Sequence, residues 1–144
     1  MASKTRVDLL GAMNKIKNIE QVMKLEGPKI LEQAGNIGVQ EMRSVIDNST
    51  TDWGSLRQSE GRESAGRRET DAMYNSVSSR VDGDVVSWGW VDGAAKYFLY
   101  QEEGTSKVAS MHSLKDSTQK VLDELPRLIK NAKARIRYAA KKGK

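Results

Sequence analysis

Two runs of strand-forming residues separated by a tight-turn signal constrain the fold of this chain most strongly. The first run, "MYNSVSSRV", places its apolar side chains on one face of a predicted strand. The turn "DGD" contains a glycine, which accepts the positive φ that a tight hairpin requires. In the return run, "VVSWGWV", both tryptophans fall on one face. The sequence therefore predicts a β-hairpin over residues 71–91, with a domain core or subunit contact built from Met73, Val77, Trp88 and Trp90.

Apolar residues at intervals of three and four extend along the chain on both sides of this hairpin. Residues 6–48 carry one such stripe, and Gly27-Pro28 interrupts it, so we expect two helical segments or one kinked helix. Residues 110–140 carry the second stripe, which Pro126 should kink. Ser110 and Ser113 are candidate caps for its start. The predicted fold is α+β, with long N-terminal helices, a small antiparallel sheet and a kinked, basic C-terminal helix.

Residues 49–70 are rich in Ser, Gly, Arg and Glu and contain few apolar side chains. Such a segment buries too little surface to offset its ordering entropy, which predicts a mobile loop within a single domain, residues 1–144. The tryptophan in this loop is the exception, because an exposed tryptophan often marks a partner surface. We interpret the loop as a candidate assembly arm whose contacts would be Trp53, Arg57, Arg62, Arg67 and Arg68.

The composition excludes several kinds of chemistry. The chain has no cysteine, which excludes disulfides and thiolate catalysis, and its only histidine, His112, argues against a histidine-based zinc site. No nucleophile-elbow or phosphate-loop pattern occurs, so we expect no cofactor and no small-molecule substrate. No apolar run reaches the length of a membrane span, and the N-terminus lacks a signal-peptide core. The expected location is the cytosolic side, with no membrane contact.

The stretch "YFLYQEEGTSK" (residues 97–107) raises the question whether its two carboxylates form a catalytic pair, part of a binding surface or a structural corner. Glu102 and Glu103 are adjacent, so they point to opposite faces of a strand or diverge by about 100° on a helix. Neither geometry brings two carboxylates together across a glycosidic bond. We therefore expect no enzyme activity.

The net charge of +5 is unevenly distributed along the chain. Between Lys107 and Lys144 there are eleven Lys or Arg against three acidic residues, whereas the rest of the chain is mildly acidic. This asymmetry suggests a polyanion or an acidic partner for the C-terminal end, and the alternative is a solvated helix face. Any nucleic-acid contact would be non-specific. The candidate contacts are Arg127, Lys130, Lys133, Arg135, Arg137, Lys141 and Lys142.

The order of the motifs resembles a family of bacteriophage tail components. The series "RRETDAMYNSV", "VVSWGWV", "YFLYQEEGTSK" and "MHSLKDS" before a long helix is similar to the gene-product-ten-like proteins of the head–tail joining region of long-tailed phages. The resemblance covers residues 67–118 densely. Asp71 stands where the family usually has glycine. The resemblance implies that residues 97–106 form a structural corner built on Tyr97, Tyr100, Glu102, Gly104 and Thr105, with the carboxylates facing solvent or a neighbouring subunit.

The same resemblance implies a function. Such a protein would be a structural component of the virion neck, made in the host cytoplasm and assembled with itself into a ring of six subunits. The ring would join head to tail, contact neighbouring neck and tail proteins, and leave a channel for double-stranded DNA. The alternatives are a tail terminator and a small cytosolic protein that binds nucleic acid through its basic C-terminal helix.

Overall fold

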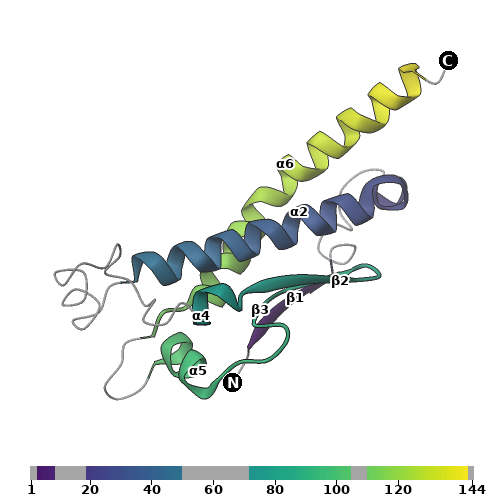
Figure 1. Ribbon diagram of the computed structural model, residues 1–144. Coiled ribbons are helices and arrows are strands. Elements are labelled where there is room, and N and C mark those ends of the chain that lie inside the picture. Colours follow the sequence, from purple (N-terminus) through teal and green to yellow (C-terminus); the bar gives the residue numbers. More distant parts are fainter. Residues whose placement is uncertain (1–2, 9–18, 50–71, 105–109, 143–144) are drawn as a thin grey trace.

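The computed structural model describes residues 3–8, 19–49, 72–104 and 110–142. Its elements, labelled as in Figure 1, are β1 (Lys4–Asp8), α2 (Ile19–Asn48), α4 (Ala72–Asn75), β2 (Ser78–Asp82), β3 (Val85–Gly89), α5 (Lys96–Glu103) and α6 (Ser113–Lys142). Two thirty-residue helices and a small antiparallel sheet confirm the predicted α+β class. Within the described ranges, no helix combines the length and apolarity needed to cross a membrane.

The sheet has three strands in the order β1-β3-β2, and both pairings are antiparallel. The central strand β3 places Trp88 opposite Thr5 of β1 and Ser79 of β2. Residues directly opposite each other point to the same face of a sheet, so this row lies on the side that the long helices cover (Figure 1). Gly83, with φ 58°, forms the tight hairpin turn that the sequence predicts.

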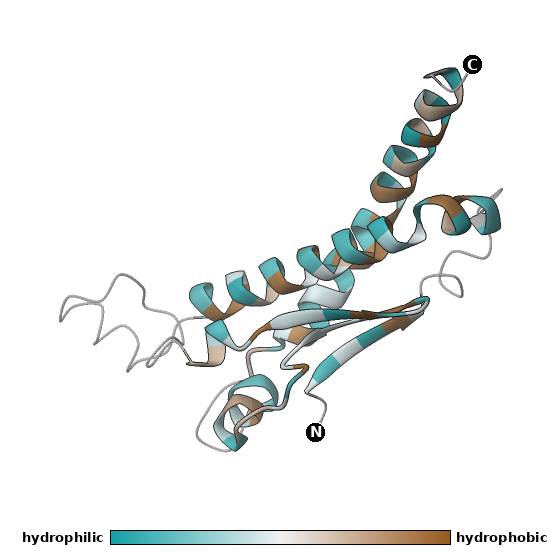
Figure 2. Ribbon diagram, turned by 45° about the vertical axis from the view of Figure 1, so that its right-hand side comes forward, coloured by the Kyte–Doolittle hydropathy of each residue, from teal (hydrophilic) through white to brown (hydrophobic). Residues whose placement is uncertain are grey.

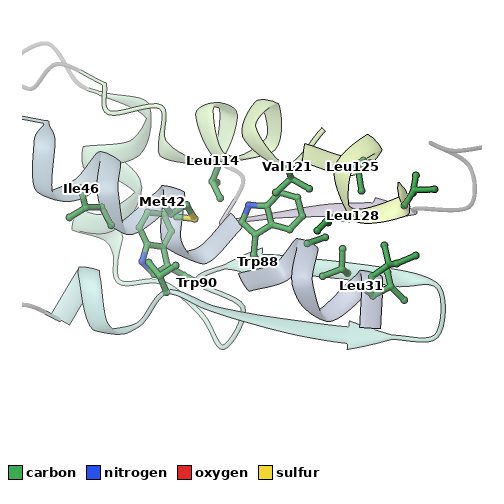
Figure 3. Packing of buried hydrophobic residues seen from close by; sticks show 14 of the residues in the cluster. Leu31, Met42, Ile46, Trp88, Trp90, Leu114, Val121, Leu125 and Leu128 are labelled. Carbon is green, nitrogen blue, oxygen red and sulfur yellow. The ribbon is translucent and has the colours of Figure 1, made fainter. Parts of the chain in front are cut away.

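The helices α2 and α6 run in opposite directions and pack on each other and on one face of the sheet (Figures 1 and 3). Trp88 lies in the middle of this core, with its indole nitrogen directed toward α6 (Figure 3). The predicted apolar stripes supply the buried side chains. From α2 these include Val22, Ile30, Leu31, Ala34, Met42 and Ile46, and from α6 Leu114, Val121, Leu125, Leu128, Ile129 and Ala132.

The prediction that residues 6–48 are helical is wrong at its start, where the chain forms β1. The segment "KTRVD" alternates, and Thr5 and Val7 are less exposed than Lys4 and Arg6. The first part of the apolar stripe, from Leu9 to Ile16, lies outside the described part of the chain. The sequence contains no partner signal for β1, because its partner β3 lies about eighty residues further along the chain.

Pro28 and Pro126 both lie inside continuous helices. The helix α2 is thus one element from Ile19 to Asn48, so the alternative of two separate helical segments is wrong. A proline in a helix interior costs about 3 kcal/mol. Both proline side chains are exposed, and buried residues precede and follow each of them. The burial of these stripes offsets the cost, because most helical stability in proteins comes from packing of an apolar face.

The paired strands of the predicted hairpin are shorter than residues 71–91 and span residues 78–89. Met73 lies in the short helix α4 instead of a strand. Its carbonyl oxygen accepts a 3.0 Å hydrogen bond from the indole Nε1 of Trp90, and its side chain is buried. Val77 is also buried, whereas Val81 is 40% exposed, so it does not belong to the core as the strand pattern suggested.

Candidate functional site

The segment predicted as a corner is the helix α5 followed by a reversal of the chain into α6. Phe98 is buried and lies 5.6 Å from Trp90 between ring centroids, so one aromatic group of this segment docks on the hairpin. Tyr97 and Tyr100 instead lie on the outer side of α5 and are 47% and 42% exposed. The helix thus divides the aromatic side chains of this segment between the core and the surface.

Glu102 joins α5 to the start of α6. Its side chain is 4% exposed, and its two carboxylate oxygens accept hydrogen bonds from the Ser113 hydroxyl at 2.5 and 2.8 Å. The backbone N–H of Leu114 donates to both oxygens at 3.1 Å. The first backbone N–H groups of a helix have no partner inside the helix, and a negative charge is favourable there. Glu102 therefore caps α6 from eleven residues upstream.

The expectation that both carboxylates face solvent or a neighbour is wrong for Glu102 and holds only for exposed Glu103. The physical reason is the helical geometry of α5, which turns adjacent side chains about 100° apart. One of them consequently enters the core while the other leaves it. The Ser113 hydroxyl and the Leu114 N–H orient the Glu102 carboxylate as a helix cap.

Backbone contacts complete the reversal between the two helices. Gly104 has φ 82°, and its N–H donates to the carbonyl oxygen of Tyr100 at 2.8 Å. The N–H groups of Met111 and His112 donate to the carbonyl oxygens of Gln101 and Glu102 at 2.9 and 3.2 Å. The role expected for Gly104 in the reversal is thus present. Thr105, the last predicted corner residue, lies outside the described residues.

The two tryptophans are the other fixed points of this region. Trp88 and Trp90 are 0% and 1% exposed, so of the two predicted roles, core or subunit contact, the structure places them in the core. The indole Nε1 of Trp88 donates to the Ser117 hydroxyl of α6 at 2.8 Å. This bond satisfies a polar group that would otherwise be buried without a partner.

Ser117→Ala should lower the free energy of unfolding by about 1–3 kcal/mol, because the change leaves the buried Trp88 N–H without an acceptor. Chemical denaturation followed by circular dichroism measures this loss. Gln119→Ala is the matched control on the same helix, since Gln119 is exposed and should change stability by about 0.5 kcal/mol or less. Equal effects of the two substitutions would contradict a structural role for the Trp88–Ser117 bond.

The predicted basic contacts occupy the distal half of α6, and only the last turns of this half project away from the sheet and α2 (Figure 1). Two of them are engaged by carboxylates. Arg127 donates to Glu124 at 2.5 Å, and Arg135 lies 3.3 Å from Glu26 of α2. The hydrogen bond from Arg127 holds the pKa of the Glu124 carboxyl group below its usual value, and the positive charges of Arg127 and Lys120 act in the same direction.

The other predicted basic residues have a different environment. Lys130, Lys133 and Arg137 line a shallow depression together with Pro126 and Ile129. Lys141 is exposed near the helix end, and Lys142 closes the helix. The residues of the candidate assembly arm, Trp53, Arg57, Arg62, Arg67 and Arg68, all lie outside the described residues.

Sequence reasoning missed the polar contacts that fix this region. It identified Ser113 only as a candidate cap, and it did not identify Ser117. A signal for Ser117 exists, because it falls in the core-facing spacing that includes Leu114 and Val121, and a polar residue at such a position usually has a buried partner. No comparable signal pairs Glu102 with α6, since Glu102 and Ser113 are eleven positions apart and belong to different helices.

A scan of the chain against protein-family models finds no match, and searches among curated proteins and solved structures find none either.

Proposed function

We propose that this chain is a structural protein of the neck of a tailed bacteriophage. It forms a homo-oligomeric ring that joins head to tail and leaves a channel for DNA. The observation that carries this proposal is the packing of the four motifs behind the resemblance. Each contributes a residue to one connected unit: Met73 bonds Trp90, Phe98 packs on Trp90, Glu102 caps α6 at Ser113, and Trp88 bonds Ser117. A series of motifs that depend on one another supports the resemblance more than isolated matches would.

The sheet also suits a ring. In the described part of the chain, β1 and β2 are the outer strands, and each pairs on one side only, with β3. An outer strand presents unpaired N–H and C=O groups that a neighbouring chain can bond. Ring assembly needs two different patches on each subunit that fit each other. The strands β1 and β2 lie on opposite sides of β3, so their outer edges supply two different patches, although both segments end in Arg-Val-Asp.

The outer side of α5 is a further candidate contact. Tyr97 and Tyr100 lie three residues apart on a helix, and both are more than 40% exposed. Exposed tyrosines are frequent anchors of protein interfaces because they combine a large apolar ring with a polar tip. We assign this face to a neighbouring subunit or to the adjoining neck or tail protein.

The proposal predicts the phenotype of a phage that carries a stop codon in this gene. Electron microscopy of the lysate should show DNA-filled heads beside full-length, unattached tails, because the joining component is missing. Mass spectrometry of wild-type particles should detect the chain. Overlong tails would instead identify a tail terminator.

Normal infectious particles that lack the chain would contradict both virion roles. The favoured function would then be non-specific nucleic-acid binding by a cytosolic protein, since this function mainly requires the basic half of α6.

A further inference from the structure

We propose that the distal half of α6 binds the phosphate backbone of double-stranded DNA through four side chains: Lys130, Lys133, Arg137 and Lys141. We call these four residues the α6 stripe. The inference deepens the proposed function and rests on it only for the place where DNA would be met, the channel of the neck. The binding itself rests on the charge and geometry of α6.

The charge of this half-helix is of one sign. Residues 127–142 contain seven Lys or Arg and no Asp or Glu. Arg127 and Arg135 face the carboxylates of Glu124 and Glu26, whereas no described carboxylate forms an ion pair with any residue of the α6 stripe. The four positive charges of the stripe thus remain available to an external anion.

The spacing aligns these charges. Residues 130, 133, 137 and 141 follow one another by three or four positions, so they share one face of the helix. The eleven steps from residue 130 to residue 141, at a rise of 1.5 Å each, give the stripe a length of about 17 Å. The major groove of B-DNA is about 12 Å wide, so a helix that crosses or follows this groove reaches phosphates of both strands.

The surroundings permit a close approach. Ala134 lies beside the stripe and is exposed and small, and the exposed ring of Tyr138 is the bulky side chain nearby. Figure 2 shows this end of α6 projecting away from the rest of the molecule. The depression beside Lys130, Lys133 and Arg137 offers a place where one phosphate would contact several cations.

The simplest alternative is a solvated helix end stabilised by its own dipole. A dipole favours cations only within the last turn, which excludes Lys130 and Lys133, both more than two turns from the end of the helix. Like charges four residues apart, as in Lys133–Arg137 and Arg137–Lys141, destabilise an isolated helix. A polyanion removes this repulsion, and its repeating charge matches a regular stripe better than the irregular carboxylates of an acidic protein surface.

The test measures binding of the purified full-length protein to a short fluorescein-labelled duplex of mixed sequence. Fluorescence anisotropy is recorded at salt concentrations from about 50 to 200 mM, where phosphate contacts change affinity steeply. The test variant is Lys130→Gln/Lys133→Gln/Arg137→Gln/Lys141→Gln. The control variant, Lys24→Gln/Lys29→Gln/Lys96→Gln/Lys115→Gln, removes the same charge from exposed lysines elsewhere. Circular dichroism verifies that both variants remain folded.

The stripe variant should bind on the order of tenfold or more weakly at about 100 mM salt, and its salt slope should fall by about 0.9 for each lost phosphate contact. The control variant should stay within about threefold of the wild type, because non-specific affinity follows the local contacts. Equal loss in both variants, or no binding by the wild type at the lowest salt, would overturn the inference. Competition by polyglutamate as effective as by DNA would assign the stripe to an acidic protein instead.

The two proposals fail separately. A chain that joins heads to tails but does not bind the duplex removes the DNA inference and leaves the neck function. If the chain binds DNA through the α6 stripe but the phage assembles normally without the chain, the neck function is removed and the DNA inference stands.

Discussion

Gly38→Ala is expected to destabilise the protein by about 2 kcal/mol or more, although the same change usually stabilises a helix interior by about 1 kcal/mol. A Cβ at this position would lie 2.5–2.6 Å from three ring atoms of Trp88. The ring cannot move aside cheaply, because it is fully buried and bonded to Ser117. Urea denaturation of the variant and the wild type, followed by tryptophan fluorescence, gives the difference in unfolding free energy.

Gly27→Ala is the matched control within the same helix. A Cβ at Gly27 would meet first the terminal methyl group of Met23 at 3.2 Å, and methionine is a flexible side chain that readily adapts. This substitution should therefore be neutral or stabilising by up to about 1 kcal/mol. Effects of the same sign and size at both positions would contradict the close packing of α2 on β3.

The glycine contacts illustrate which parts of the fold were predictable. The burial of Val86, Trp88 and Trp90, the turn at Gly83 and the apolar stripes along α2 and α6 depend on local spacing, and the described part of the chain contains them. The closeness of α2 to the sheet was not predictable, since a glycine in a helical pattern signals weak propensity as readily as close packing. Only the position of the Trp88 ring shows that such a glycine in α2 reflects close packing and not merely weak helix propensity.

The elements that prediction missed are short and depend on distant partners. β1 has five residues, and its pairing with β3 is formed across most of the chain. The helix α4 has four residues, and a hydrogen bond from Trp90 to its Met73 fixes the chain there. Periodicity over so few residues cannot decide between helix and strand, whereas a tertiary contact can.

The candidate site shows the same limit. The seven cations of distal α6 are evident in the sequence, but their division into paired and available groups is not. Arg135 meets Glu26, which lies 109 positions away in the chain. Such a pairing depends on how α2 and α6 pack, so it emerges only from the structure.

Glu102→Ala is expected to lower the free energy of unfolding by about 3 kcal/mol, or to lower the melting temperature by about 10 °C. The change removes a charged acceptor and leaves two buried donors, the Ser113 hydroxyl and the Leu114 N–H, without it. Loss of an N-cap alone costs about 1 kcal/mol, and an unsatisfied buried donor costs about 1–3 kcal/mol more. Differential scanning calorimetry measures the shift.

The neighbouring residue provides a stringent control. Glu103→Ala removes the same charge from an exposed position, so it should change stability by about 0.5 kcal/mol or less. A double-mutant cycle with Ser113→Ala tests the contact itself. Once Glu102 is absent, removal of the Ser113 hydroxyl should cost far less than in the wild type, because its partner is gone. Additive losses in the double variant would contradict a contribution of the Glu102–Ser113 bond and would leave the Leu114 N–H as the only donor that Glu102 caps.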